Sequence, residues 1–477
     1  MDKQKIINEV LVPLENAGFK AYFVGGCVRD GLLGKDPHDY DVVTNARPDD
    51  IHRIFPKIID IKSESFGIVV INIDGENIEI ATFRKDRECD GRHADVVYAD
   101  TIGEDAERRD FTINALYQDK YGNIYDPTGL GENDIQYGFI RFIGSIYDRC
   151  KEDNLRILRY FRFAATLTRK DGSFFTFAED IKEIKNLIDD PAFILSFNRR
   201  VSGERVGKEL RKLISGKNAP KIINLMSNIP MRMFDKIFPK EFYDLECQPT
   251  YSKYHTTSNN LAHSLAVFRK MCDITDNFEL RAAALLHDVG KFVCQDEAGH
   301  ALDHEIASAE ICEPFLKENW KLTNHELKSI MHYIRYHMDM HKITETKHPE
   351  KIWKFMYSHE FDGLLLLLKA DCVDVPSESD DYTKLVNHPL FEFFKKIEYP
   401  SAFTGPDLME FVSPGIFLDK GIEAANASFA RELIRAYKYG TTGKVISKKA
   451  ILKQAAERVI QLRKNEEVKK TSILMSK

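Results

Sequence analysis

Two carboxylates, Asp39 and Asp41, stand two residues apart in a segment whose residue types favour a β-strand. Side chains alternate across a strand, so both carboxylates point to the same face and repel each other unless they share a cation. A hard divalent ion with oxygen ligands, Mg²⁺ before others, suits such a pair and leaves room for substrate phosphates. An isolated Asp-x-Asp is usually only an exposed strand edge. Here Gly25, Gly26 and Arg29 come shortly before it, and glycines let backbone amides approach a triphosphate, so the combination favours a metal and phosphate site.

The segments around this motif predict a small mixed or antiparallel sheet that positions it. Four segments resemble short strands: residues 21–24, 40–44, 67–73 and 77–83. Asp74-Gly75, between the last two, is a dipeptide suited to a tight hairpin. Glu79 lies in the middle of the strand after this hairpin, where it could supply a third carboxylate from a neighbouring strand.

A pair of arginines, Arg108 and Arg109, begins the segment Arg108-Arg109-Asp110-Phe111-Thr112-Ile113-Asn114-Ala115. Guanidinium groups match phosphate geometry, so this pair could clamp a triphosphate. The alternative is a surface ion pair of Arg109 with Asp110 or Glu107. From these residues alone, the ion pair is the favoured interpretation.

An aspartate and an arginine, Asp153 and Arg156, follow in Glu152-Asp153-Asn154-Leu155-Arg156, with Arg159 and Arg162 further along. An ordinary ion pair three residues apart at a helix N-terminus explains them structurally. In the functional interpretation, a carboxylate and a guanidinium pair with the amino donor and ring-nitrogen acceptor that adenine and cytosine share. Guanine and uracil present the reverse order, a carbonyl acceptor beside an N–H donor, and would not pair with these two side chains. A correct two-point contact favours the right base over a wrong one by about 1–3 kcal/mol.

The second half of the chain carries scattered histidines and aspartates around one adjacent His-Asp pair. His263 precedes His287-Asp288, and Asp371 follows an apolar run. Nitrogen and oxygen donors in this order suit a divalent transition metal or Mg²⁺. Because the chain has 15 histidines, the alternative is a set of buried core histidines without a metal.

Length and composition favour a multidomain globular protein. A chain of 477 residues, 43% of them hydrophobic, can fill several cores. The amphipathic N-terminus differs from a secretion signal, and no apolar run approaches the ~20 residues of a membrane span, so we expect a cytoplasmic protein without membrane contact. Eight scattered cysteines without a Cys-x-x-Cys pair indicate neither a zinc ribbon nor a disulfide framework.

The chain is similar to the class II tRNA nucleotidyltransferase and bacterial poly(A) polymerase family. The resemblance runs from Tyr22 to about Leu167 and rests on Gly25-Gly26-Cys27-Val28-Arg29-Asp30, the Asp39 and Asp41 pair and the arginine motifs. A weaker continuation covers Val201-Ser202-Gly203-Glu204-Arg205-Val206 and Glu209-Leu210.

The family resemblance implies a role for each matching residue. Asp39 and Asp41 would bind the catalytic Mg²⁺ ions, and Gly26, Arg29 and Arg109 would hold the nucleotide. A nucleotide-selecting helix would carry Asp153, Arg156, Arg159 and Arg162. Residues 84–95, including Asp90-Gly91-Arg92, resemble the family's flexible loop that helps it change from CTP to ATP.

The second half resembles the HD metal-dependent phosphohydrolase superfamily. This resemblance implies His263, His287, Asp288 and Asp371 as ligands of a metal such as Ni²⁺, Co²⁺, Mn²⁺ or Mg²⁺. His304 and His337 would contact phosphate or a second metal.

Together these features predict an α+β head with a small sheet, followed by a mostly helical neck, body and HD domain. The expected boundaries are a head at 1–138, a neck at 139–200, a body at 201–255, an HD domain at 256–376 and a basic tail at 377–477. Residues 438–477 contain eleven Lys or Arg and only three Glu. This excess of positive charge alone indicates RNA binding only weakly, because such runs are usually solvated helix faces.

The expected function is addition of CCA to the 3′ end of tRNA from CTP and ATP, with release of pyrophosphate. Poly(A) synthesis and addition of only A or only CC remain open within the same fold. An HD phosphatase or phosphodiesterase as the main activity is the alternative from another class. The sequence leaves the oligomeric state open.

Overall fold

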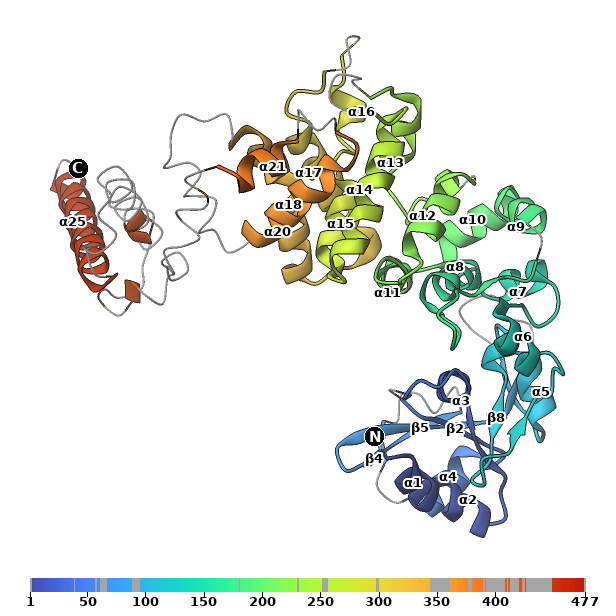
Figure 1. Cartoon of the computed structure of the whole chain (residues 1–477). Coiled ribbons are helices and arrows are strands. Elements are labelled where there is room, and N and C mark those ends of the chain that lie inside the picture. Colours follow the sequence, from blue (N-terminus) through green and yellow to red (C-terminus); the bar gives the residue numbers. More distant parts are fainter. Residues whose placement is uncertain are drawn as a thin grey trace. The chain divides into compact units, whose positions relative to one another are not determined.

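The computed structural model divides the chain into two compact units. One contains residues 1–243 and 314–322, and the other contains residues 244–313 and 323–477. Figure 1 shows both units coloured along the sequence. Within residues 2–475, the structure describes all but 38, 56–57, 61–66, 88–94, 180, 230, 251–255, 297–299, 344–360, 376–379, 389–390, 392–407, 410, 412–419, 423–424 and 426–447.

The first unit begins with the sheet that positions the two aspartates. Its strands lie in the order β3-β4-β5-β2-β1-β8-β9. Strand β2 pairs antiparallel with β1 and parallel with β5, so the sheet is mixed, which confirms the predicted fold class. The strands are β1 Ala21–Val24, β2 Asp41–Thr44, β3 Ile58–Asp60, β4 Ile68–Ile73, β5 Glu76–Thr82, β8 Tyr117–Gln118 and β9 Ile124–Tyr125.

The predicted hairpin joins β4 to β5. Asp74 and Gly75 both have positive φ, 51° and 89°, which is the conformation that a two-residue turn between twisted strands requires. Gly75 tolerates this conformation without cost, and the short polar side chain of Asp74 tolerates it better than a branched one. The hairpin fixes the register of β5 and therefore the place of Glu79.

A separate two-stranded antiparallel sheet spans the segment predicted to be a flexible loop. Strand β6 Arg84–Arg87 pairs antiparallel with β7 Asp95–Tyr98. The segment between these strands, including Asp90-Gly91-Arg92, lies outside the described residues, as does His38.

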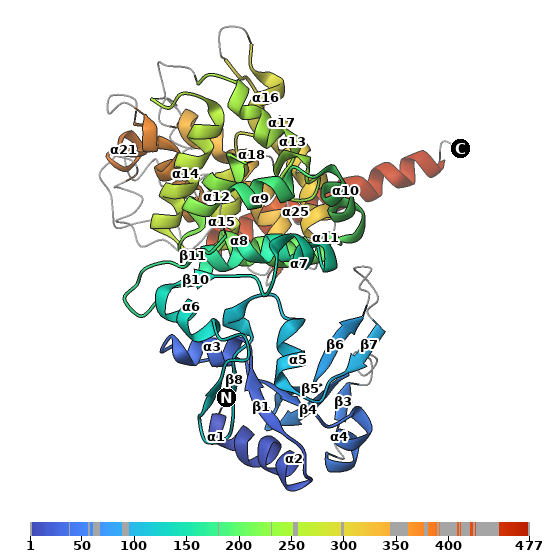
Figure 2. The same cartoon turned by 90° about the vertical axis from the view of Figure 1, so that its right-hand side faces the viewer.

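Short helices accompany the sheet. In both views α1, α2 and α4 lie at the end of the sheet away from α8 (Figure 2). The predicted N-terminal amphipathic segment buries Ile6, Val10, Leu11 and Leu14. These elements are α1 Lys3–Ile6, a π-helix Ile7–Leu11, α2 Val12–Asn16, α3 Gly26–Leu32, α4 Pro48–Ile54, α5 Ile102–Glu107, a 3₁₀-helix Thr112–Asn114 and α6 Gly131–Tyr137.

The rest of the first unit is helical apart from a small parallel pair, β10 Phe139–Ile140 and β11 Thr176–Phe177. Helix α8 is the most buried of these helices because apolar residues cover most of its circumference. Helix α11 begins at the N-cap Ser202, whose side chain accepts from the Arg205 amide. The helices are α7 Ile146–Glu152, α8 Arg156–Thr166, α9 Ile181–Ile188, α10 Pro191–Arg200, α11 Gly203–Ile214, α12 Ala219–Ser227 and α13 Lys240–Asp244.

The second unit is a helical bundle. Helices α14, α15, α18 and α20 pack against one another. The bounds are α14 Asn260–Ile274, α15 Phe278–Leu286, α16 Lys291–Cys294, α17 His304–Phe315, α18 Asn324–Ile343, α20 Phe361–Asp371, a 3₁₀-helix Cys372–Asp374, α21 Asp381–Val386 and α25 Lys448–Met475. Among the described helices, none is both long and apolar enough to cross a membrane.

Candidate functional site

The predicted carboxylates meet at the start of β2. Asp41 is the first residue of β2, and Asp39 precedes it in irregular chain. Both are exposed, whereas Tyr40 between them is buried, so the side chains alternate as expected. Glu79 in β5 stands opposite Asp41 in the parallel register. The structure therefore brings together the three carboxylates that the sequence singled out.

The charge of this cluster favours a cation. Partial burial by surrounding atoms, followed by the negative charge of Glu79, raises the pKa of Asp41 to about 6, although its side chain reaches solvent. Arg109 opposes this shift, and Asp39 adds to it. Carboxylates crowded enough to raise a pKa fit a hard divalent ion, because such an ion would stabilise their charged forms.

The predicted phosphate-binding glycines form the turn between β1 and α3. Gly25 has φ 75° and ψ −126°, a conformation that only glycine adopts readily. A Cβ atom there would lie 3.8 Å from Nη1 of Arg109. The turn thus brings the backbone of Gly25 close to the guanidinium group of Arg109. Backbone amides and guanidinium groups both bind phosphate oxygens in proteins.

Arg109 does not form either of the surface ion pairs that the sequence favoured. Its Nη2 donates to Oδ2 of Asp105 at 2.9 Å, and its Nε donates to the Tyr117 hydroxyl at 3.1 Å. Asp105 sits four residues earlier in α5 and is fully buried. Burial would raise the pKa of Asp105, but Arg109 and Arg108 hold it at about 2. The prediction was wrong because a buried carboxylate needs a cation more than an exposed one does.

A buried carboxylate, Asp110, joins the next residues into one network. Oδ2 of Asp110 accepts from Nε of Arg159 at 2.9 Å, and its Oδ1 accepts from the Asn114 amide at 3.0 Å. Oδ1 of Asn114 in turn accepts from Nη1 of Arg29 at 2.7 Å. Arg29 is 9% exposed and lies over the Phe163 ring. The network links α3 to α8.

Asp153 lies before the predicted nucleotide-selecting helix and not on it. Helix α7 ends at Glu152, and Asp153 is extended, with φ −141° and ψ 105°. Its carboxylate accepts from the Leu155 amide and its carbonyl from the Arg156 amide. Asp153 therefore forms the turn that leads into α8, whose N-cap position is Leu155, and aspartate side chains commonly bond a backbone amide two residues on in such turns.

Asp153 and Arg156 have separate partners. Oδ2 of Asp153 accepts from Nη2 of Arg205 at 2.6 Å. Nη1 of Arg156 donates to Glu152 at 2.5 Å, and its Nη2 donates to the Arg108 carbonyl at 2.8 Å. Asp153 and Arg156 therefore do not form the ion pair that their spacing suggested, because each binds the partners named above.

Two partners in α11 were missed as site residues. Glu209 accepts from Nε of Arg162 at 2.8 Å and lies 3.5 Å from Nη1 of Arg159. Arg205 and Glu209 belong to the weaker continuation of the family resemblance, which implies no role for them. The available signal was their spacing of four residues, which puts both side chains on one face of α11. Their partners in the segment from Asp153 to Arg162 cannot be predicted from α11 alone.

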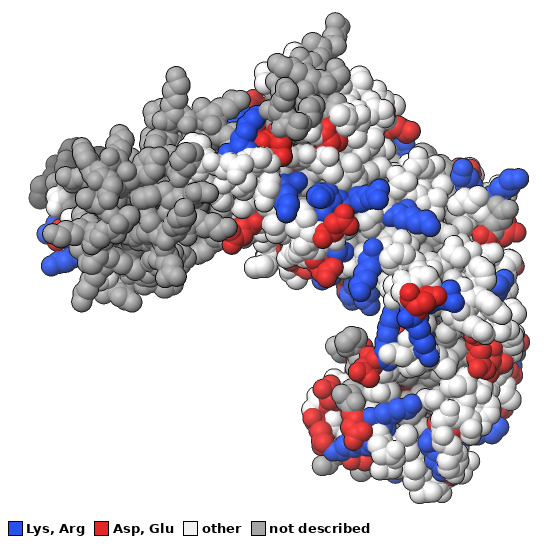
Figure 3. Space-filling view, viewed as in Figure 1, with Lys and Arg blue, Asp and Glu red and all other residues white. Residues whose placement is uncertain are grey.

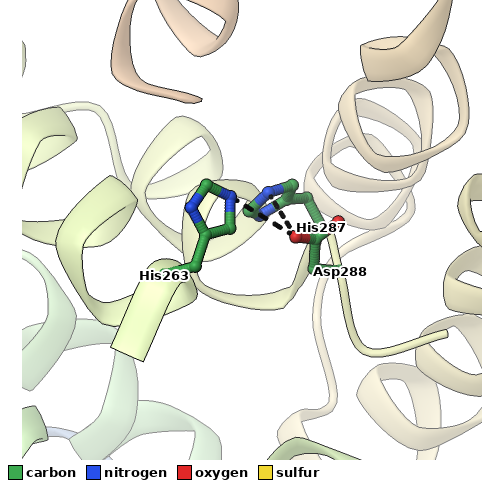
Figure 4. A group of neighbouring side chains, drawn as sticks. All are labelled: His263, His287 and Asp288. Atoms are coloured by element: carbon green, nitrogen blue, oxygen red, sulfur yellow. Dashed lines mark ion pairs between the residues drawn. The ribbon is translucent and has the colours of Figure 1, made fainter. Parts of the chain in front are cut away.

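In the second unit, Figure 4 shows His263, His287 and Asp288 turned toward one another. Nε2 of His263 and Nε2 of His287 lie 3.4 Å and 3.3 Å from Oδ2 of Asp288. Oδ1 of Asp371 lies 2.9 Å and 3.3 Å from the same two nitrogens. The four predicted ligands, from α14, α20 and the end of α15, therefore converge in one buried cluster.

The other oxygen of Asp288 faces two further histidines. Oδ1 of Asp288 lies 3.1 Å from Nε2 of His304 and 3.7 Å from Nε2 of His337. The two nitrogens are 3.2 Å apart. Asp288 thus stands between two pairs of histidines, His263 and His287 near Oδ2 and His304 and His337 near Oδ1.

Unsatisfied polar atoms support a metal in this cluster. Within the described residues, Nε2 of His287 and both carboxylate oxygens of Asp288 are buried without a hydrogen-bond partner of suitable geometry. Nζ of Lys291 lies 2.6 Å from Oδ2 of Asp288 as an ion pair. Burial alone would lower the pKa of His287, but Asp288 and Asp371 raise it to about 10. Buried polar atoms of this kind are usually paired or coordinate a metal.

An outer set of residues around the cluster was missed. Nε2 of His341 lies 2.8 Å from Oδ2 of Asp371, and its Nδ1 lies 2.9 Å from Asp381. Nδ1 of His263 lies 3.0 Å from Asp374. Carboxylates behind a histidine orient the imidazole toward a metal. The four-residue spacing of His341 from His337 on α18 was the available signal.

Two family profiles match different parts of the chain. Residues 21–141 match the poly A polymerase head domain. Residues 260–374 match the HD domain. The chain therefore carries both domains that the sequence resemblances named.

Curated relatives are CCA-adding proteins. The chain is 33% identical over 268 residues to CCA tRNA nucleotidyltransferase 1, mitochondrial, of Danio rerio, covering 55% of this chain and 59% of that protein. It is 38% identical over 224 residues to the CCA-adding enzyme of Oceanobacillus iheyensis, covering 46% and 52%. The match spans about half the length of these relatives.

Solved structures of similar fold span nearly the whole chain. The CCA-adding enzyme of Bacillus stearothermophilus in complex with CTP has a TM-score of 0.59 at 24% identity, covering 98% of this chain and 100% of that one. The Thermotoga maritima CCA-adding enzyme complexed with tRNA has a TM-score of 0.54 at 18% identity, covering 96% of each chain. These likenesses concern the fold.

The buried cluster predicts metal binding that depends on His287. Mn²⁺ or Ni²⁺ at a hundred times its Kd should add about 2.7 kcal/mol to the free energy of unfolding of the unit that holds it. In His287→Ala this stabilisation should disappear, whereas the exposed His325→Ala control should retain it. Thermal melting with and without metal, together with metal analysis, measures both effects. An equal rise in Tm in all three proteins would contradict the site.

Proposed function

We propose that this chain, which carries a poly A polymerase head domain and an HD domain, adds CCA to the 3′ end of tRNA. The carrying observation is the convergence of Asp39, Asp41 and Glu79 beside the Gly25 turn and Arg109. The names of the curated relatives support this proposal. CTP and ATP would be the substrates and pyrophosphate the leaving product.

In the proposed reaction, Asp39 and Asp41 would hold Mg²⁺, with Glu79 opposite Asp41 on the neighbouring strand as a third carboxylate. When bound, Mg²⁺ would lower the pKa of the attacking hydroxyl and shield the triphosphate charge. The residues of the chain supply binding and orientation. The Gly25-Gly26 turn and Arg109 face the phosphates, and the buried network of Arg29 fixes α3 behind them.

Base choice is assigned to Asp153 and Arg156. A carboxylate and a guanidinium match the donor and acceptor edge common to cytosine and adenine. Arg205 would hold the carboxylate of Asp153 in place, and Glu152 would do the same for Arg156. Arg159 and Arg162 reach the site only indirectly, because Asp110 and Glu209 already bind them.

Removing either carboxylate of the pair should abolish nucleotide addition. Asp39→Ala and Asp41→Ala should each lower the rate by about 100-fold or more, as loss of one transition-state stabiliser does. Asp49→Ala, an exposed aspartate on α4, is the matched control. Transcripts of tRNA ending before CCA, after C and after CC, incubated with each nucleotide, give the rates. Near-normal addition by either variant in Mg²⁺ would overturn the metal assignment.

The same transcripts distinguish CCA addition from the other activities that this fold could support. Full CCA on the shortest transcript supports the proposal. Addition of a single A only to the CC transcript, of CC only, or of a long A tail would instead identify a specialist or a poly(A) polymerase.

Base selection should depend on Asp153 more than on any phosphate contact. Asp153→Ala should raise misincorporation of UTP and GTP by about tenfold, the effect of losing one to two kcal/mol of discrimination, with little change in KM for CTP. Arg205→Ala should relax selection in the same direction, because it frees the carboxylate. The matched control is Arg199→Ala, at the C-terminal end of α10. Strict selection for CTP and ATP in Asp153→Ala would show that the base-edge account is wrong.

A phosphohydrolase activity of the HD domain is a second candidate. The observation that favours it is that Nε2 of His287 and both carboxylate oxygens of Asp288 are buried without a hydrogen-bond partner among the described residues and could bind a metal. Nitrogen and oxygen donors in one cluster suit Ni²⁺, Co²⁺ or Mn²⁺ over Mg²⁺. Terminal or cyclic phosphates would be the substrate class, because a divalent metal held by these residues would supply a water nucleophile for phosphate hydrolysis.

The two activities should separate by mutation. Replacing His287 and Asp288 together by alanine should remove any Ni²⁺- or Mn²⁺-dependent hydrolysis of p-nitrophenyl phosphate or 2′,3′-cyclic nucleotides. Addition should stay within about twofold of the unmodified protein, because the two sites belong to separate compact units and share no residue. Circular dichroism and thermal melting check the fold. Equal loss of both activities in folded protein would mean that the HD segment belongs to the nucleotide-adding unit.

A further inference from the structure

An open hollow of about 480 Å³ lies where α3, α8 and α11 end. Its polar lining combines cationic and hydroxyl side chains from three parts of the first unit. Among them are Lys35, Arg162, Thr168, Lys212, Ser215 and Lys217. Figure 3 shows Lys and Arg gathering over the region of α8 and α11.

Positive charge in this hollow is incompletely neutralised. In the part of the chain that the structure describes, neither Lys212 nor Lys217 forms an ion pair, and both are exposed. Nζ of Lys35 donates to the Thr168 hydroxyl at 3.0 Å. Partial burial lowers the pKa of Lys35, and Arg29 and Lys217 lower it further against the opposing Asp30. Cations that crowd one another in this way are stabilised by an added anion.

The elements that carry the nucleotide-binding residues also lead to this hollow. Helix α3 begins at Gly26, and the chain reaches Lys35 just beyond its end. Helix α8 begins at Arg156 and presents Arg162 to the hollow about 9 Å further along, at 1.5 Å per residue. The hollow therefore lies at the far ends of the two helices whose near ends form the nucleotide site.

We infer that this hollow binds backbone phosphates of the RNA a few nucleotides upstream of its 3′ end. An RNA whose terminal hydroxyl reaches Asp39 and Asp41 must bring its preceding phosphates past neighbouring surfaces. Lysine ammonium groups and hydroxyls bind phosphate oxygens without reading bases, as a substrate whose end changes with each addition requires. The inference rests on the proposed function in that the RNA is the acceptor of nucleotide addition.

The test uses the full-length protein with Lys212→Gln and Lys217→Gln combined. Both side chains are exposed, so the fold should be unaffected. Lys20→Gln with Lys185→Gln removes the same charge at exposed positions outside the hollow. Lys212→Arg with Lys217→Arg retains the charge in it. The probe is a fluorescent tRNA transcript that lacks CCA, measured by anisotropy over a range of salt concentrations and, separately, in addition assays.

In the glutamine pair, Kd and KM for the transcript should rise about tenfold, the effect of losing charged hydrogen bonds. The slope of log K against log salt should become shallower by about 1.4 for two contacts to single-stranded RNA, or about 1.8 for a duplex. The kcat and the KM for CTP should stay unchanged, and the arginine pair should bind as the unmodified protein does.

Unchanged affinity and salt slope would overturn the inference, as would equal weakening in the Lys20 and Lys185 control. A higher KM for CTP with normal transcript binding would assign the hollow to the triphosphate instead. If no protein adds nucleotides, the proposed function fails, while the anisotropy data still decide whether the hollow binds RNA.

Discussion

The carboxylate of Asp110 joins the elements of the first unit that carry the candidate nucleotide site. It is buried and accepts from the Phe111 amide, the Asn114 side chain and Arg159. Burial would raise the pKa of Asp110, but Arg159 and these hydrogen bonds hold it at about 2. Removing one partner of such a buried pair typically costs about 3–5 kcal/mol. The place of α3, through Asn114 and Arg29, and the place of α8, through Arg159, both depend on this one charge.

The two candidate metal centres differ in exposure to solvent and in the type of ligand atoms. Asp39, Asp41 and Glu79 are exposed at a strand end, where water and a large triphosphate can enter. Oxygen donors there suit Mg²⁺, which keeps part of its hydration and shares substrate phosphates. His287 and Asp288 are buried, so their ligand geometry must be fixed by a surrounding set of partners such as Asp374 and His341. A buried imidazole set favours a transition metal held by the protein.

Local patterns predicted the elements, and long-range partners could not be read from them. The hairpin at Asp74-Gly75 follows from the backbone preference of two residues. The register of Asp41 with Glu79 comes from the parallel pairing of β2 and β5, which the hairpin does not determine. The pairs Arg109 with Asp105 and Asp153 with Arg205 were missed, because electrostatic satisfaction of a buried group depends on the folded neighbourhood. In the HD cluster the candidate ligands were predicted from the resemblance to the HD superfamily, whereas the outer carboxylates behind them were not.

Template-free choice of a base, as proposed for Asp153 and Arg156, requires rigid side chains. A side chain that reads a base must hold its donor or acceptor before the base arrives, since otherwise a wrong base could find an alternative rotamer. Arg156 is held by two backbone carbonyls and Glu152, and is 9% exposed. Asp153 is held by Arg205 and the Leu155 amide. In the proposed reading, a wrong base would leave these fixed polar groups unpaired, and that penalty, more than attraction to the right base, would set the selectivity.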